Sequence, residues 1–308
     1  MSAGFWFQQS LNTLQLAGFY LPLAVAFALI QGITRRIFLS FGDFAMFGSF
    51  AAIYACFAAM VRGDGDLLAS IWALLLAIAA GAALGAVIAK AVMGRKLLEN
   101  PLAFMIASIG VSIALQEVMR LQSSSRDVWV PPLLAGQSVF SLGGDFPVRL
   151  SVMSAYAIAV GLIAVLLVGL LLGYTRFGLH WRACAQSPKL SALCGLDASL
   201  VAHQSFAIAG ALAGVTGWTS AIFYGGANFS TGLLVGFKAM FASVIGGFGS
   251  IRGAIVGACA LAIIEVLWSA LFSTTYRDVA VFLIIIVALV LRPEGLTGLH
   301  TERESEQP

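Results

Sequence analysis

The stretch that organises this chain is residues 174–217, YTRFGLHWRACAQSPKLSALCGLDASLVAHQSFAIAGALAGVTG, which starts with a polar break between long apolar runs. A short helix is predicted at the centre of this break. Ser187 is a good N-cap, and Pro188 suits the first helical position, where its missing N–H costs nothing. Gly195 stands where a left-handed residue closes many helices. These signals predict a capped helix over residues 188–194.

The predicted helix is too short to be stable alone, because isolated helices of this length are marginal in water. Leu190, Leu193 and Cys194 form an apolar stripe at i, i+3 and i+4 spacing, the pattern of a packed helix face. The stripe therefore docks either on the body of this protein or on a partner. The location of the stretch relative to the membrane bears on this choice.

The composition indicates an integral membrane protein. Of the 308 residues, 60% are hydrophobic and 10% are charged, against roughly a quarter charged in ordinary soluble domains. The apolar runs have about the 20 residues that a helix needs to cross a bilayer, and the alternation of barrel strands is not seen. The N-terminal residues, MSAGFWFQQS, lack a basic segment and a small-residue cleavage site, so we expect the first helix to be retained. The net charge of +3 is spread over loops, which gives no case for nucleic-acid binding.

We expect an all-α membrane protein, a polytopic bundle of eight or nine transmembrane helices that forms a single domain over residues 1–308. The candidate spans are 13–33, 37–61, 68–93, 102–121, 151–174, 203–224, 237–250, 251–272 and 276–292. The segment 237–250 is ambiguous, because Gly246, Gly247 and Gly249 weaken a helix there. It either crosses the membrane or re-enters on the same side.

If all nine segments cross, most of the 17 Lys and Arg residues fall on the side that carries the loop 175–202 and the tail 293–308. The positive-inside rule then places that side in the cytoplasm and the N-terminus outside. The segment 122–150 lies outside, where its frequent Pro and Gly residues predict a turn-rich loop over the outer face. A re-entrant 237–250 would invert the side of every preceding loop.

Charged side chains inside membrane helices are costly and are candidates for function. Lys238 and Glu265 lie at similar distances from the turn near Gly249, so they either pair or Lys238 extends to the outer surface. Asp43 opens a helix on the cytoplasmic side, where a carboxylate favours the helix dipole. Glu117 and Arg120 have the i, i+3 spacing of a simple ion pair.

Small residues recur at four-residue spacing, a pattern that lets membrane helices approach closely and predicts a tightly packed, oligomeric bundle. The positions are Gly81 and Gly85, Gly210 and Gly214, and Gly249, Gly253 and Gly257.

Signatures of catalysis are missing from the sequence. It contains no phosphate-binding G-x-x-x-x-G-K-[ST] loop, no H-E-x-x-H and no G-x-S-x-G, and its three histidines lack a carboxylate constellation. The four cysteines fit no common zinc pattern and are expected to be free thiols, so no metal site is predicted. A transporter without its own ATP site, and with a docking helix facing the cytoplasm, indicates that another subunit supplies the energy.

Four segments of the chain resemble the permease family of bacterial branched-chain amino acid ABC importers, of the LivH type, and the resemblance covers nearly the whole chain. The segments are 176–214, RFGLHWRACAQSPKLSALCGLDASLVAHQSFAIAGALAG; 236–257, GFKAMFASVIGGFGSIRGAIVG; 291–298, LRPEGLTG; and 41–48, FGDFAMFG. The chain departs from the family pattern where Leu39 and Ser40 replace a usual Asn-Phe, and where Arg252 replaces a usual Pro.

The resemblance implies a multi-pass subunit of the bacterial inner membrane, in which 122–150 is a periplasmic loop, 175–202 a cytoplasmic coupling loop and 293–308 a cytoplasmic tail. The implied partners are a second permease of the LivM type, two cytoplasmic ATPases and a periplasmic solute-binding protein, besides membrane lipid. ATP and Mg²⁺ would be held by the ATPases, so this chain itself would bind no cofactor. The capped helix would then dock on an ATPase.

Two sets of site residues follow. ATPase coupling is assigned to Arg182, Ala183, Ser187, Pro188, Leu190, Leu193 and Gly195. Translocation or gating is assigned to Asp43, Phe44, Lys238, Gly246, Gly247 and Glu265.

Two other classes of function remain open. An ion-coupled secondary transporter or channel would use Lys238, Glu265 and Asp43 as coupling groups, whereas a membrane-embedded enzyme is disfavoured by the missing signatures. Urea, short amides and small aromatic acids are alternative substrates to branched-chain amino acids.

Overall fold

The computed structural model describes residues 3–63, 65–92, 100–130, 137–141, 147–292 and 295–296. Eight helices in this part of the chain are long and apolar enough to cross a membrane. The helices are α1 (Ala3–Thr34), α2 (Phe41–Arg62), α3 (Asp66–Val92), α5 (Pro101–Gln122), α6 (Val152–Tyr174), α7 (Arg176–Gln186), α8 (Pro188–Leu193), α9 (Ala198–Tyr224), α10 (Thr231–Gly246), α11 (Ile251–Leu271) and α12 (Arg277–Leu291), with a 3₁₀ turn, η1, at Thr274–Tyr276. The expected helical membrane bundle is confirmed.

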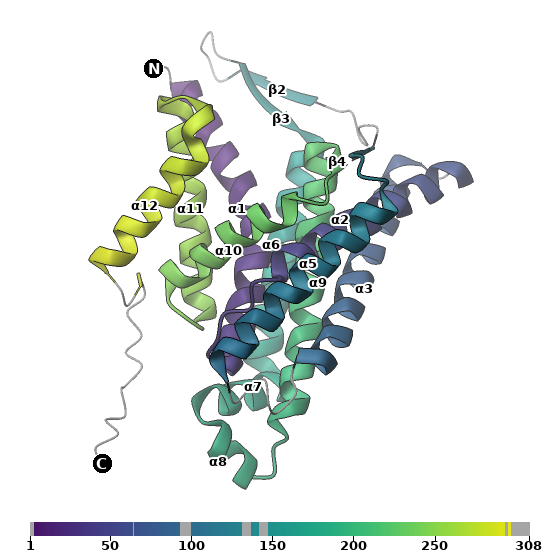
Figure 1. Cartoon of the computed structure of the whole chain (residues 1–308). Coiled ribbons are helices and arrows are strands. Elements are labelled where there is room, and N and C mark those ends of the chain that lie inside the picture. The colour runs from purple at the N-terminus through teal and green to yellow at the C-terminus, as the bar shows by residue number, and fades with distance from the viewer. Residues whose placement is uncertain are drawn as a thin grey trace.

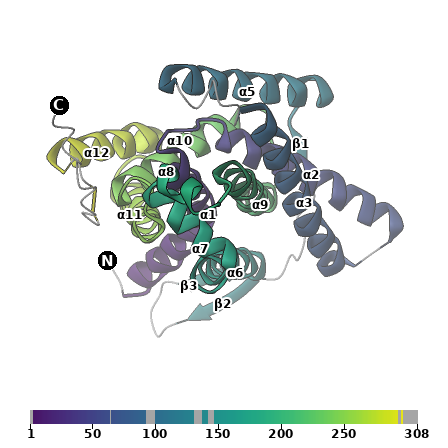
Figure 2. The same ribbon diagram turned by 90° about the horizontal axis from the view of Figure 1, so that it is seen from below.

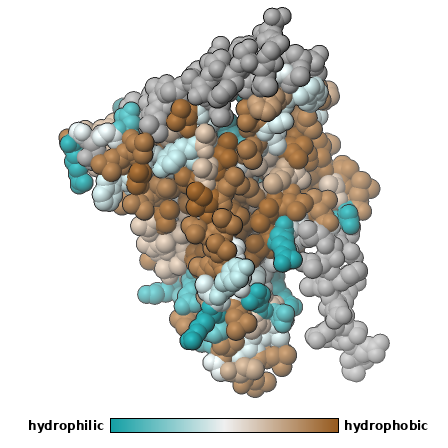
Figure 3. Space-filling view, turned by 180° about the vertical axis from the view of Figure 1, so that it is seen from behind, coloured by the Kyte–Doolittle hydropathy of each residue, from teal (hydrophilic) through white to brown (hydrophobic). Residues whose placement is uncertain are grey.

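The bundle has two distinct ends. Helices α7 and α8 form the lower end in Figure 1, and strands β2 (Gln137–Ser141) and β3 (Pro147–Ser151) lie at the opposite end. Figure 2 shows α1 and α9 inside the bundle, α11 and α12 together on one side, and α5 along an outer edge. A broad apolar band separates the more polar regions in Figure 3, as a lipid-embedded belt requires.

Short strands shape the end of the bundle opposite α7 and α8, which the sequence predicted only as a turn-rich loop. Following the predicted orientation, this is named the outer end, and the end with α7 and α8 the inner end. β2 and β3 pair antiparallel, with Gln137 opposite Ser151. β1 (Val128–Trp129) pairs antiparallel with β4 (Gly226–Ala227) and so joins the segment after α5 to the segment after α9. The residues between these strands, 131–136 and 142–146, lie outside the described part of the chain.

The spaced glycines pack helices of this one chain against each other. A Cβ atom at Gly81 of α3 would stand 2.2 Å from the carbonyl oxygen of Gly210 in α9, and one at Gly214 would stand 2.2 Å from that of Ala77. The α3–α9 contact is therefore backbone against backbone, which only residues without a large side chain permit. The tight packing expected from these positions is present, but it lies within the subunit and gives no support for an oligomer.

Helix α10 is short, yet it does not turn back. It follows β4 at the outer end, and the turn after it brings Gly249 against Gly32, near the opposite end of α1. The Leu296 backbone N–H, beyond α12, donates to the Ile245 carbonyl at the same end, at 2.7 Å. The segment 225–246 therefore completes a ninth crossing with a 16-residue helix, so the side of each loop agrees with the nine-span interpretation.

Helix α2 begins deep inside the bundle, which corrects the expected span 37–61. After α1, residues 35–40 are not helical, and Phe38 is buried against Phe104 of α5 and Phe206 of α9. A Cβ atom at Gly42 would stand 2.0 Å from the Gly232 carbonyl oxygen of α10. The chain thus returns from the inner end as a non-helical segment before helix α2 starts.

Candidate functional site

The inner end is built on α7, an 11-residue helix that the sequence analysis missed within the predicted coupling loop. The Thr175 hydroxyl caps it by accepting from the Gly178 N–H at 3.4 Å. The buried indole of Trp181 donates to the Leu29 carbonyl of α1 at 3.1 Å and packs on Gly32. The apolar spacing of Phe177, Trp181 and Cys184 is the signal that predicts this helix. Helix α7 is thereby fixed to the inner half of α1.

Arg35 ties the end of α7 to the end of α1. Its guanidinium donates to the carbonyl oxygens of Gln186, at 2.9 Å, and Ala185, at 3.3 Å. Helix ends leave carbonyl groups without partners, and a cation favours the negative end of the helix dipole. The backbone that enters α8 therefore starts from a fixed position rather than from a free loop.

The expected capped helix is present as α8. The Ser187 hydroxyl accepts from the Leu190 N–H at 3.4 Å, and Pro188 occupies the first turn. At the other end, Gly195 has a φ of 80°, and its N–H donates to the Ala192 carbonyl. The Leu196 N–H donates to the Ser191 carbonyl at 3.0 Å, which completes a Schellman motif. Both ends of this single turn and a half are held by local hydrogen bonds.

The leucines of the apolar stripe of α8 remain exposed among the residues that the structure describes. Leu190 is 64% exposed and Leu193 is 85% exposed, and Cys194 is exposed as a free thiol. An apolar tip is visible at the lower end in Figure 3, where Figure 1 places α8. Arg182 is exposed and Ala183 is half-buried on α7 beside it. Within the described part of the chain, the two leucines therefore do not follow the interpretation in which the stripe docks on the protein's own body.

Substitutions at Gly195 are expected to act through backbone conformation. No described atom lies within 4 Å of where its Cβ would stand, so side-chain size itself meets no obstacle. A left-handed φ is strained for L residues, most of all for β-branched ones. We expect Gly195→Val to reduce uptake more than Gly195→Ala. Uptake per assembled transporter measures this effect.

Gly173 provides the matched control, because it also has open space around its Cβ position but lies inside helix α6. Gly173→Ala is expected to leave uptake unchanged. Equal losses for the alanine and valine variants of Gly195 would show that the left-handed backbone is not what matters there.

A buried charge network joins four helices in the middle of the bundle. Lys238 of α10 pairs with Glu265 of α11 at 2.9 Å and with Asp278 of α12 at 2.8 Å. Glu265 also accepts from the Tyr20 hydroxyl of α1 at 2.9 Å, and Arg277 Nε lies 3.2 Å from it. Lys238 and Glu265 are each 2% exposed. The Lys238–Glu265 pair is one of the two alternatives that the sequence left open, whereas the other three residues were not anticipated.

Gly246 and Gly247, assigned from the sequence to translocation, lie in the hairpin between α10 and α11. A Cβ at Gly246 would stand 1.8 Å from the Gly253 carbonyl oxygen, and Gly247 has a φ of 133°. The turn that follows closes with a hydrogen bond from the Ser250 N–H to the Gly247 carbonyl. The structure gives both glycines a packing and turn role, and their part in gating stays a prediction.

The sequence analysis placed Asp43 at the cytoplasmic boundary, and the structure corrects this position. Asp43 is fully buried, and its carboxylate accepts from the Ser112 hydroxyl and, at 2.8 Å, from the Gln116 amide. Both donors belong to the middle of α5, so Asp43 lies deep in the bundle because α2 starts there. Phe44, beside it, is fully buried and packs edge-on against Phe41. The ion pair Glu117–Arg120 is present as expected, at 2.5 Å.

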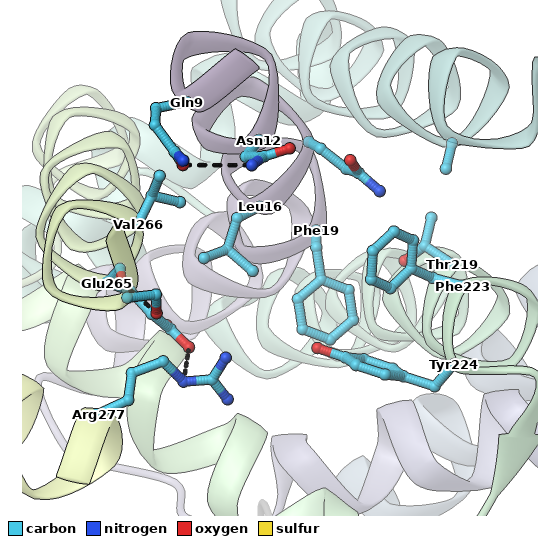
Figure 4. Close-up of a pocket in the computed structure, with 13 residues that line it drawn as sticks. Gln9, Asn12, Leu16, Phe19, Thr219, Phe223, Tyr224, Glu265, Val266 and Arg277 are labelled. Atoms are coloured by element: carbon cyan, nitrogen blue, oxygen red, sulfur yellow. Dashed lines mark hydrogen bonds and ion pairs between the residues drawn. The ribbon is translucent and has the colours of Figure 1, made fainter. Parts of the chain in front are cut away.

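A cavity of about 350 Å³ opens beside the charge network, towards the outer half of the bundle. Its walls come from α1, α6, α9, α11 and α12 (Figure 4). The lining residues named in that view are Gln9, Asn12, Leu16, Phe19, Thr219, Phe223, Tyr224, Glu265, Val266 and Arg277. Of these, the sequence analysis had selected Glu265 alone. The remainder are far apart in the chain, and no local motif marks them.

The fold is that of a multi-pass helical membrane protein, with an exposed apolar helix at one end and a cavity of mixed polar and apolar lining among its long helices. The sequence matches the family described as the permease component of branched-chain amino acid transport systems over residues 9–290. The chain belongs to this family.

Curated relatives extend over the same length. The chain is 34% identical to the high-affinity branched-chain amino acid transport system permease protein LivH of Escherichia coli K12, covering 96% of each chain. It is 31% identical to the corresponding protein BraD of Pseudomonas aeruginosa, over 95% of this chain and 96% of that one. A probable LivH of Methanocaldococcus jannaschii is 33% identical over 46% of this chain and 47% of its own length.

Proposed function

We propose that this chain is a membrane-spanning subunit of an ATP-driven importer in a bacterial inner membrane, and that it moves branched-chain amino acids into the cell. The observation that carries the proposal is the apolar stripe of α8, which is rigidly capped, fixed to α7 and left exposed at the inner end. Contiguous apolar side chains on a water-exposed protein surface often mark the binding site of a partner. A cytoplasmic ATPase subunit is the partner that this end of a transport subunit requires.

In this proposal the complex contains a second permease of the LivM type, two ATPases that hold ATP and Mg²⁺, and a periplasmic solute-binding protein. Closure of the ATPases pushes on α8, and α7 passes the motion to α1 through Trp181 and Arg35. The binding protein delivers its solute at the outer end, where β2 and β3 lie. This chain contributes no catalytic group of its own.

The ion-coupled alternative would use Lys238, Glu265 and Asp43. Lys238 and Glu265 neutralise each other within a network that also includes Arg277 and Asp278. Asp43 is held by two side-chain donors. Groups that are both fully buried and already paired, as these three are, are poorly placed to take up and release an ion, which favours the ATP-driven interpretation.

Reconstitution in liposomes tests the proposal. The chain would be assembled with the ATPases, second permease and binding protein of its organism, and uptake of labelled leucine, isoleucine and valine would be measured. We expect uptake that needs internal ATP and the external binding protein and that survives ionophores. Uptake without ATP, abolished by an ionophore, would establish the ion-coupled class. Uptake of urea, short amides or aromatic acids in place of these amino acids would correct the substrate.

A further inference from the structure

The cavity next to the charge network has the size and the two-sided chemistry of a small-molecule site. Its volume of about 350 Å³ falls within the range of roughly 300–1,000 Å³ that is typical of ligand pockets. Leu16, Phe19, Phe223 and Val266 supply apolar surface. Amide, hydroxyl and charged groups share the remaining lining. This combination suits a solute that is apolar at one end and charged at the other.

Arg277 supplies a cationic group with donors to spare. Its Nε lies 3.2 Å from Glu265 and 3.4 Å from Asp278, and the side chain remains 39% exposed. Its two terminal nitrogens have no partner among the described residues. In Figure 4 they point away from Glu265. A guanidinium binds a carboxylate through two parallel hydrogen bonds, so these nitrogens form a carboxylate-binding fork.

Glu265 does not compete for that fork. One of its oxygens accepts from Lys238 and lies 3.2 Å from Arg277 Nε, and the other accepts from the Tyr20 hydroxyl. Lys238 and Arg277 balance the charges of Glu265 and Asp278 within the network. A carboxylate that enters the cavity therefore meets a balanced network in which the Arg277 terminal nitrogens still offer hydrogen-bond donors.

The opposite part of the lining provides oxygen acceptors on α1. The side-chain amide nitrogen of Gln15 donates to the Ser154 hydroxyl at 3.0 Å. This leaves the side-chain amide oxygen of Gln15 without a partner among the described residues. Gln9 presents an oxygen that accepts from Asn12 at 3.2 Å and can accept once more. Such oxygens suit an ammonium group, which has three donors.

We propose that this cavity binds a zwitterionic α-amino acid with an aliphatic side chain during its passage from the outside. The Arg277 terminal nitrogens hold its carboxylate, amide oxygens of α1 receive its ammonium group, and its side chain lies against Phe19 and its apolar neighbours. The proposal deepens the proposed function and rests on it for the identity of the substrate. It also gives the charge network a second role, because Glu265 orients the guanidinium.

Protection of an introduced cysteine tests the site directly. Ser269 lines the cavity, and among the described residues its hydroxyl donates to the Glu265 carbonyl one turn earlier, so Ser269→Cys is a mild change. Thr275, exposed in η1 outside the cavity, gives the matched control Thr275→Cys. The complete transporter, in liposomes, would be treated with a membrane-impermeant thiol reagent, and labelling of the parent protein would be subtracted.

We expect L-leucine to slow the labelling of Ser269→Cys and to leave that of Thr275→Cys unchanged. L-leucinamide, which lacks the carboxylate, should give no protection. With Arg277→Gln added, the leucine concentration that gives the same protection should rise at least about tenfold, because a hydrogen bond to a charged group is lost. The leucinamide comparison needs no Arg277 variant, so it holds even if that variant assembles poorly.

Three outcomes would overturn the site. These are labelling that leucine does not slow, equal protection by leucine and leucinamide, and a cysteine that the reagent never reaches because lipid fills the cavity. If ATP-driven leucine uptake persists in the same liposomes, the proposed function stands without the site. Protection without such uptake would keep the site and reject the proposed function.

Discussion

Replacing both Leu190 and Leu193 by Asp is expected to abolish ATP-driven uptake and to release the ATPase from the purified complex. Burial of a leucine contributes roughly 1.5–3 kcal/mol, so loss of both removes about 3–6 kcal/mol from the docking free energy. That corresponds to a 10²- to 10⁴-fold weaker complex at about 1.4 kcal/mol per factor of ten. Two carboxylates in an apolar groove would weaken it further. Co-purification and ATPase-linked uptake measure the effect.

The subunit itself should remain folded, because both side chains are exposed and contribute little to its own core. A double change to Met keeps volume and apolar character and should retain most of the coupling. Normal assembly and normal uptake by the Asp variant would show that α8 is not the docking element.

The second large effect is expected in the charge network. Removing one partner of a buried ion pair leaves an uncompensated charge and costs about 3–5 kcal/mol. We therefore expect Lys238→Met and Glu265→Leu each to lower the thermal stability and folded yield of the transporter. The double variant should recover much of the loss, because Arg277 and Asp278 lie 3.4 Å apart and can balance each other.

Glu117 and Arg120 provide the matched control for this experiment. Their side chains are 49% and 42% exposed, and exposed ion pairs of this kind contribute little to stability. Single changes there should be mild. If the Lys238 and Glu265 effects simply added, within about 0.5 kcal/mol, the two residues would not be energetically coupled. The assignment of α8 would be unaffected, because it depends on other residues.

The elements that the sequence predicted well are those that local chemistry determines. Apolar runs located the crossings and left only the segment 237–250 undecided, and Ser187, Pro188 and Gly195 marked α8 because capping depends on neighbours within a few residues. The pairing of Lys238 with Glu265 was accessible because a single hairpin connects their helices. In each case the deciding residues are either close together in the chain or on two helices joined by a single hairpin.

The parts that the sequence missed depend on contacts between distant segments. Asp43 seemed to lie at the membrane surface, because nothing local shows that residues 35–40 return into the bundle before α2 begins. Tyr20 and Arg277 reach Glu265 from α1 and α12, so no motif could have revealed them. Helix α7 is different, since the spacing of Phe177, Trp181 and Cys184 was a usable signal that the polar residues between them obscured.

The central claim is that α8 is the point at which an ATPase drives this subunit, and cross-linking from position 193 tests it most directly. A photoreactive side chain at Leu193 would be activated in the assembled transporter, and the same group at Val279, exposed on α12, would serve as the control. We predict a strong cross-link from position 193 to an ATPase subunit, altered by ATP, and none to it from position 279. Cross-links from position 193 that reach only lipid or another permease would contradict the claim.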